Sequence, residues 1–482
     1  MRHGRRGDRA SARGAARYAT LKLVPFDFLR IAERMLATPS VTTQGTAELV
    51  RFLCRAVVPD LPGEPLLLPE PDGADVNLLV VVPGRDRHPA LLLNSHLDTV
   101  PPGERRAWTA TGGNPFRPRR DGDRLVGLGS ADAKLDWLCK AEALRRACVA
   151  GALKRTVYLL GTWGEERGLR GARRFLEGDA VPRPVAALVG EPTECRLVTQ
   201  HKSLFVATVR FVAEPQRVEI GRLRARVRRY KGRAAHSATP EQGESAILKC
   251  LGDVADETPV IGIRGGDAAN RVPALCELEV ASTRRSRSAS PDDVPDPGLR
   301  LMSPALFVAA RDFARGLARL GTVDPRADPA FTPPRLTAGI GCIAGRGEAL
   351  EITFDVRLLP GANRATVRQA LDALVNEIKA SYAGLRASLV VERDDPALPE
   401  APRMFIQTAL DAMAASGLAP STATKAGCTE AGLYASAGIP AVVFGAGRSI
   451  GNIHAPNEWT SLSQLEGAVA FYAKFLRMYC GA

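Results

Sequence analysis

The chain has 482 residues, of which 45% are hydrophobic and 24% are charged, and both fractions are typical of globular proteins. Its length predicts two or more domains. No apolar stretch approaches the ~20 residues that a membrane span requires, so we expect no membrane partner. The net charge of +13 comes from arginines spread along the chain with few aromatic residues among them, and we expect no nucleic-acid partner.

The N-terminus and the cysteines bear on where the protein acts. Residues 1–20 are rich in Arg, Gly and Ala, and no apolar segment follows them as it would in a secretory signal. We expect a basic disordered tail there, with a transit-like peptide or a nucleic-acid-binding tail as alternatives. The nine cysteines are scattered and form no CxxC motif, which favours a reducing cytoplasm over a disulfide framework.

In chain order, the first two hundred residues alternate between helices and apolar strands. Helices are predicted over residues 26–36, 45–57, 129–149 and from about 169. Strands are predicted over residues 76–82, 90–94, 124–127, 156–161 and 185–190. This alternation predicts a mostly parallel sheet flanked by helices.

Imidazole and carboxylate side chains follow four of these strands. In chain order they are His96, Asp98, Asp132, Glu165, Glu166 and Glu191. Taken singly, each has a purely structural explanation: Asp132 could cap a helix, and the Glu-Glu pair could lie in a solvated loop. The carboxyl ends of parallel strands lie side by side, and open α/β sheets hold their sites there. The joint placement therefore predicts a metal site at this edge.

From about residue 200 the pattern changes to alternating strands. Strands over 204–211, 277–281 and 350–358, with helices over 243–254, 302–320 and 365–380, predict a small inserted α+β domain. Residues 284–296 are expected to form a loop. The segment 222–231 predicts a strand with one solvated basic face, in preference to a nucleic-acid patch.

The pattern of the first part returns near the C-terminus. A helix over 404–416, a strand over 441–444 and a helix over 464–478 are predicted there. Two further histidines stand beside distinctive stretches: His236 lies in the turn-rich GRAAHSATP, and His454 lies in the loop 451–458.

The residue types at the strand ends indicate the chemistry. Imidazoles with carboxylates are the ligand set of Zn²⁺, or of Mn²⁺ and Co²⁺. One bridging carboxylate with two further ligands for each ion would form a two-metal hydrolytic site, with the ions about 3.5–4 Å apart. Such a pair lowers the pKa of a bridging water to near neutrality, which makes it a nucleophile for an amide carbonyl.

Six separated blocks of the sequence occur in the same order as in a known family. They are SHLDTVPP, DGDRLVGLGSADAK, GEERGLRGA, VGEPTECRLVTQHKS, GRAAHSATPEQGESAI and GNIHAPNEW. Together they resemble the M20 family of dizinc aminoacylases and peptidases over residues 90–458. The stretches GLGSADAK, GEPT followed by HK, and CTEA at 428–431 resemble the acetylornithine deacetylase members most.

The resemblance implies an α/β fold in which a mostly parallel-sheet metallohydrolase domain carries an inserted smaller α+β (ferredoxin-like) lid and dimerisation domain. The implied catalytic domain comprises residues 21–199 and 395–482, and the lid comprises residues 200–394. The resemblance also implies a homodimer with two Zn²⁺ ions per subunit, with Co²⁺ or Mn²⁺ as alternatives.

Metal-binding roles can be carried over by resemblance, residue by residue. Asp132 would bridge both ions. His96 and Glu191 would complete the coordination of one ion, and Glu166 and His454 would complete that of the other.

The resemblance implies further roles around the substrate. Glu165 would be the general base, and Asp98 would orient the neighbouring metal-binding histidine. His236 would reach across the dimer to the substrate carbonyl. Asn270 and Arg357 would hold the α-carboxylate of the substrate, the arginine through a bidentate pair.

The implied function is hydrolysis of the amide bond of a small-molecule N-acyl amino acid in the cytoplasm, with N-acetylornithine as first candidate. Alternatives within the family are a carboxypeptidase or dipeptidase and a succinyl-diaminopimelate desuccinylase. A non-catalytic metal-binding protein is the alternative outside it. Three departures from the family pattern leave the substrate and lid closure open: Leu135 stands where Gly is usual, GTWGEE lacks the Asp that usually precedes the Glu pair, and residues 282–338 add a segment to the lid.

Overall fold

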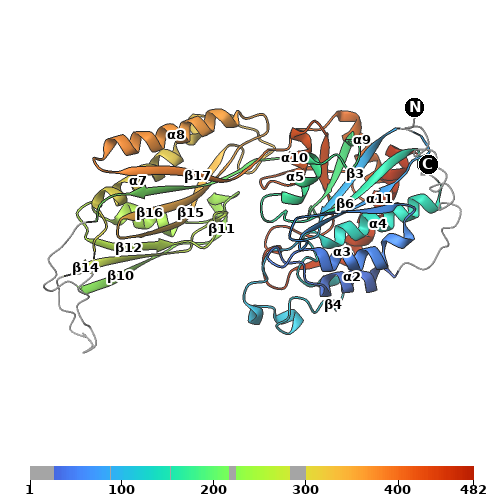
Figure 1. Ribbon diagram of the computed structural model, residues 1–482, viewed down its shortest axis with the longest axis horizontal. Helices are drawn as coiled ribbons and strands as arrows, with labels where there is room; N and C mark the ends of the chain where they lie inside the picture. Colours follow the sequence, from blue (N-terminus) through green and yellow to red (C-terminus); the bar gives the residue numbers. More distant parts are fainter. Residues whose placement is uncertain (1–26, 87, 152, 216–223, 283–299, 482) are drawn as a thin grey trace. The chain divides into compact units, whose positions relative to one another are not determined.

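The computed structural model describes residues 27–86, 88–151, 153–215, 224–282 and 300–481. The tail predicted over 1–20 and the loop predicted over 284–296 lie outside the described residues. The chain divides into two compact units (Figure 1). The first unit is Met1–His201 with Leu398–Ala482, and the second is Lys202–Ala397.

The first unit is built on an eight-stranded sheet with the order β1-β2-β6-β3-β7-β19-β8-β18. Its strands are β1 (Glu64–Pro69), β2 (Val76–Val82), β3 (His88–His96), β6 (Arg155–Thr162), β7 (Ala186–Gly190), β8 (Leu197–His201), β18 (Thr422–Lys425) and β19 (Ala441–Phe444). The central run from β6 to β19 is parallel throughout, as is the pair β8 and β18. The pairs β1–β2, β2–β6 and β19–β8 are antiparallel. The prediction of a mostly parallel sheet is confirmed.

Helices cover both faces of this sheet (Figure 1). One face carries α2 (Phe28–Ala37), α3 (Ala47–Ala56), α4 (Lys134–Val149), α9 (Arg403–Ala415) and α11 (Leu462–Cys480), and the other carries α5 (Arg170–Glu177) and α10 (Glu430–Ser436). In β3, Leu91 and Leu93 belong to one core and Leu92 to the other, and all three are 0% exposed. Alternate side chains of a strand point to opposite faces, so a strand covered on both faces is an unbroken apolar run.

The strand register places the predicted site at one edge of this sheet. His96 at the end of β3 is the register partner of Thr162 at the end of β6, and Ser95 is the partner of Gly190 at the end of β7. The chain segments that follow β6 and β7 carry the acidic residues of the predicted site. Three of the four strand ends are therefore neighbours.

The fourth strand end belongs elsewhere, which corrects the sequence interpretation. β5 (Arg124–Val126) pairs with β4 (Arg119–Asp121) and with β20 (Trp459–Ser461) in a separate antiparallel sheet. β20 follows β5 by more than three hundred residues, so local patterning does not reveal the pairing. Asp132 nevertheless reaches the same edge, on the loop that leads from β5 into α4.

The second unit is α+β, as predicted. Its sheet is antiparallel and has the order β10-β14-β12-β15-β16-β9-β17. These strands are β9 (Leu204–Val212), β10 (Arg224–Lys231), β12 (Val260–Gly265), β14 (Leu275–Ser282), β15 (Thr337–Arg346), β16 (Ala349–Arg357) and β17 (Arg386–Asp395). The core beneath the sheet is completed by α6 (Ala246–Asp253), α7 (Pro304–Ala318) and α8 (Arg364–Ser381). A two-stranded ribbon pairs β11 (Ala235–His236) with β13 (Arg271–Val272).

The basic segment forms the strand β10, but not with one solvated face. Residues 225–229 are exposed on both faces, and Val227 is 50% exposed. β10 is the edge strand of its sheet, so among the described residues no further strand pairs with its outer side. In the part of the chain that the structure describes, no helix has the length and apolar character to span a bilayer.

Candidate metal centre

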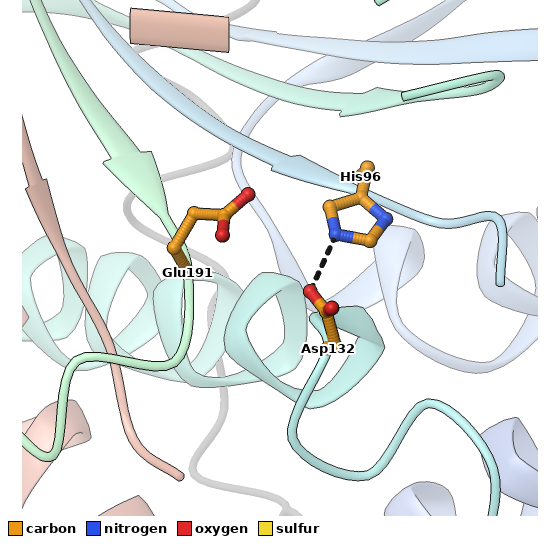
Figure 2. A group of neighbouring side chains, drawn as sticks. All are labelled: His96, Asp132 and Glu191. Atoms are coloured by element: carbon orange, nitrogen blue, oxygen red, sulfur yellow. Dashed lines mark hydrogen bonds and ion pairs between the residues drawn. The ribbon is translucent and has the colours of Figure 1, made fainter. Parts of the chain in front are cut away.

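Three side chains from different elements converge at the edge of the sheet (Figure 2). His96 ends β3, Asp132 precedes α4, and Glu191 directly follows β7. All three are buried, and Nε2 of His96 lies 3.0 Å from Oδ1 of Asp132. One nitrogen or oxygen from each residue lies within 4.8 Å of the corresponding atoms of the other two. We call these residues the first ligand group.

A second ligand group uses the other oxygen of the same aspartate. Nε2 of His454 lies 3.2 Å from Oδ2 of Asp132 and 3.0 Å from Oε1 of Glu166. One ligand atom from each of Asp132, Glu166 and His454 lies within 4.8 Å of the others. His454 has a positive φ of 55°, a strained conformation of the kind that clusters at functional sites. Asp132 is thus shared by two groups of three.

The electrostatics of the two groups favour a cation. Burial by itself would raise the pKa of Asp132, but hydrogen bonds with His454 and His96 bring that pKa far below its ordinary value. Burial disfavours the imidazolium of His454, yet Glu166 and Asp132 raise its pKa to about 11. The carboxylates therefore stabilise positive charge placed between them.

Asp98 connects the end of β3 to the loop after β6. Nδ1 of His96 lies 3.0 Å from the backbone carbonyl oxygen of Asp98 and 3.7 Å from its carboxylate. The carboxylate accepts hydrogen bonds from the backbone N–H groups of Glu165, at 3.1 Å, and Glu166, at 3.4 Å. A proton on Nδ1 leaves the Nε2 lone pair of His96 directed toward Asp132.

The loop that carries Asp132 is held by a carboxylate that the sequence interpretation missed. Glu458 is 1% exposed, and its Oε1 accepts from the backbone N–H groups of Ala131, at 2.8 Å, and Asp132, at 3.0 Å. Its Oε2 accepts from the N–H of Gly129 at 3.0 Å. Glu458 lies within GNIHAPNEW, and a glutamate so near His454 was the available signal.

The structural explanation considered for Asp132, a helix N-cap, is wrong. The N-cap of α4 is Ala133, and no side chain caps this helix end by a hydrogen bond. The side-chain oxygens of Asp132 instead face His96 and His454. A capping role would have turned the carboxylate toward the first backbone N–H groups of the helix.

Two more charged residues beside the first ligand group were missed, the half-buried Lys425 and the buried Glu430. Lys425 ends β18 and places Nζ 2.5 Å from Oε2 of Glu191. Glu430 begins α10, and burial, opposed by His96 and Thr162, raises its pKa to about 7. Neither residue follows a strand predicted from the sequence, and Glu430 was noted there only as part of the CTEA stretch.

The predicted substrate-binding residues lie in the second unit. His236 is exposed, and its Nδ1 accepts a hydrogen bond from the backbone N–H of Ala238 at 3.0 Å, which leaves the proton on Nε2. The backbone oxygen of Asn270 accepts from the N–H of Ser237 at 2.9 Å. Arg357 is 2% exposed, and its Nε donates to Asp355 at 3.0 Å. The roles inferred for these residues stay predictions.

Comparison with known proteins adds the family and the fold. The model of peptidase family M20/M25/M40 matches residues 92–478. The chain is 30% identical over 281 residues to the acetylornithine deacetylase of Klebsiella pneumoniae, and 31% identical over the same length to that of Salmonella paratyphi B. Each match covers 52% of this chain and 66% of the relative, so the chain spans just under two thirds of these relatives.

Solved structures share the fold over nearly the whole chain. The aminoacylhistidine dipeptidase of Vibrio alginolyticus has a TM-score of 0.63 and 16% identity, covering 95% of this chain and 97% of that one. A dinuclear metal-binding peptidase of the M20 family from Bacillus subtilis has a TM-score of 0.57 and 15% identity, covering 97% and 99%. Both likenesses concern the fold alone.

Proposed function

The chain belongs to the M20/M25/M40 family of metal-dependent hydrolases, and from this premise we propose that it hydrolyses the amide bond of an N-acyl amino acid. N-acetylornithine is the first candidate substrate, because the curated relatives are named acetylornithine deacetylases. The observation that carries the proposal is the pair of ligand groups that share Asp132. A non-catalytic protein would have no need for this arrangement with a further carboxylate, Glu165, beside it.

The residues present fit two Zn²⁺ ions. His96, Asp132 and Glu191 would hold one ion, and Asp132, Glu166 and His454 would hold the other. Imidazole nitrogen and carboxylate oxygen are zinc ligands, and three protein ligands per ion leave a coordination position open, as catalytic zinc sites do. Co²⁺ and Mn²⁺ accept the same donors and are the alternatives.

When bound, the two ions supply an activated water and polarise the scissile carbonyl. Glu165 takes the proton of the attacking water and returns it to the leaving amine. Its backbone N–H donates to Asp98 at 3.1 Å, and the residue is only 9% exposed, so the base is held in place and largely shielded from solvent. His236, protonated on Nε2, donates to the carbonyl oxygen of the substrate across a homodimer.

The proposed enzyme is a cytoplasmic homodimer in which the second unit serves as lid and dimerisation domain. The cytoplasmic placement rests on the nine scattered cysteines, which form no CxxC motif. The second candidate function is a dipeptidase or carboxypeptidase, and the shared fold with a dipeptidase supports it. A desuccinylase for succinyl-diaminopimelate is the third.

The test is release of free amine from a panel of substrates. The panel contains N-acetylornithine, other N-acetyl amino acids, N-succinyl-diaminopimelate and dipeptides, each assayed with Zn²⁺ or Co²⁺ and again after chelation. We expect chelator-sensitive turnover of the N-acetyl class. Turnover confined to dipeptides would replace the proposal by the second candidate. No turnover of any substrate by protein that holds two ions would overturn it.

A further inference from the structure

A lysine lies beside the first ligand group. Lys425 ends β18, the strand parallel to β8 at the edge of the sheet. Its Nζ lies 2.5 Å from Oε2 of Glu191, and its side chain is 19% exposed while that of Glu191 is 6% exposed. The ammonium group of Lys425 therefore lies beside a carboxylate that would hold one of the ions.

This placement creates a competition for one carboxylate. Glu191 cannot fully compensate both Lys425 and a divalent ion, because its single negative charge would be shared between them. An ammonium group that is mostly buried and has lost its counter-ion is costly, so it requires another anion close by. Lysine can meet that requirement because its flexible four-carbon stem lets three donors turn toward a new partner.

The arginine that the sequence resemblance assigned to the substrate carboxylate already has an anionic partner. Arg357 is 2% exposed, its Nε lies 3.0 Å from Oδ2 of Asp355, and its Nη2 donates to Oγ of Ser237 at 3.2 Å. Its charge is thus balanced within the second unit. The partner of Lys425, in contrast, is a residue whose charge the proposed ions would take up.

Every N-acyl amino acid carries an α-carboxylate close to the scissile amide. We propose that Lys425 binds the α-carboxylate of the substrate and thereby selects N-acyl amino acids over their neutral amides. This specificity role rests on the proposed function. It uses the charge of Lys425 and the position of its ammonium beside Glu191, and it places the substrate anion next to the first ligand group.

The test compares matched substrates with matched variants. Lys425→Met keeps the length of the side chain without its charge, Lys425→Arg keeps the charge, and Lys474→Met changes an exposed lysine on α11 as control. The probes are an N-acetyl amino acid that the enzyme hydrolyses and the same compound with its α-carboxylate replaced by a carboxamide. The wild type should prefer the acid.

We expect Lys425→Met to lower kcat/KM for the acid by about 10- to 100-fold, mainly through KM, the range of a lost charge-assisted hydrogen bond. Its activity on the carboxamide should be unchanged, so that the discrimination disappears. Lys425→Arg should restore part of the discrimination, and the control should match the wild type. Equal loss on acid and carboxamide would overturn the proposal.

Two further measurements distinguish binding of the α-carboxylate from support of the metal site and from recognition of an acyl carboxylate. In calorimetric titration, Lys425→Met should bind Zn²⁺ at least as tightly as the wild type, because a competitor for Glu191 has been removed. Weaker zinc binding would contradict the assignment. A loss seen only with N-succinyl substrates would place the recognised carboxylate on the acyl group and overturn the α-carboxylate assignment.

The proposed function and the role of Lys425 can fail separately. Binding of a free amino acid and of its carboxamide to the zinc-loaded protein can be measured by calorimetry without turnover. Selective loss of amino-acid binding in Lys425→Met would support the carboxylate role even if the substrate panel gave no turnover. Unchanged amino-acid binding in Lys425→Met would refute the carboxylate-binding role of Lys425, whatever turnover the substrate panel shows.

Discussion

Replacement of Glu458 is the perturbation with the most direct structural prediction. Glu458 is 1% exposed and accepts three hydrogen bonds from the backbone N–H groups of residues 129–132. Glu458→Ala leaves those three buried donors without an acceptor, and each costs about 1–3 kcal/mol. Part of this loss is offset because burying the carboxylate is itself unfavourable: burial raises the pKa of Glu458 to about 7.

The net destabilisation expected for Glu458→Ala is about 3 kcal/mol. Glu458→Gln keeps one acceptor oxygen for Ala131 and Asp132 and loses the bond to Gly129, so about 1 kcal/mol is expected. Urea unfolding of the metal-free protein measures both values. The exposed helical residue Glu466 supplies the control, since Glu466→Ala should change stability by under about 0.5 kcal/mol.

Glu458→Ala should also weaken metal binding, because Glu458 orients the backbone of the shared ligand Asp132. Loss of an orienting partner typically lowers metal affinity by about 10- to 100-fold. Calorimetric titration of Glu458→Ala with Zn²⁺ gives the comparison, with Glu466→Ala again as control. Stability within about 1 kcal/mol of the wild type, together with unchanged zinc affinity, would refute the reasoning.

Four further predictions follow from the site and its surroundings. Glu165→Ala should retain two ions by calorimetry but lose about 10²- to 10⁴-fold in kcat, and near-wild-type kcat would exclude Glu165 as the base. The pKa of Glu430, raised by burial from 4.5 to about 7, contributes stability that is complete below pH 4.5 and is lost as the pH rises through about 7. The unfolding free energy of the metal-free wild type should therefore fall by on the order of 3 kcal/mol over that window relative to Glu430→Gln, and parallel pH profiles would contradict this. Asp136→Ala leaves the 0% exposed Lys140 without its partner at 2.6 Å and should cost about 3–5 kcal/mol in urea unfolding, partly recovered by adding Lys140→Met. Chelation should lower the unfolding free energy by about 2.7 kcal/mol for each bound ion from its value at free Zn²⁺ of 100 times Kd, and a Tm that does not respond to chelator would argue against resident ions.

Much of the first unit could be predicted from local sequence. Apolar runs such as Leu91–Leu93 identify strands that are covered on both faces, and the following His96 and Glu191 identify the ends of those strands. Because parallel strands end at one edge, the order of elements was enough to predict that His96, Glu166 and Glu191 would share that edge, whereas Asp132 reaches it from a strand of a separate antiparallel sheet. The structure does bring these four together with His454 in two groups.

Only the tertiary structure decided the rest of the site. Three contacts of the site join segments more than two hundred residues apart. They are the pairing of β5 with β20, the ion pair of Lys425 with Glu191, and the hydrogen bonds from the backbone of the Asp132 loop to Glu458. Such contacts leave no periodic trace, because one hydrogen bond between a side chain and a distant backbone requires no pattern in either segment. Hydrophobic periodicity determined where strands and helices form, whereas the packing of distant loops determined which charges face each other.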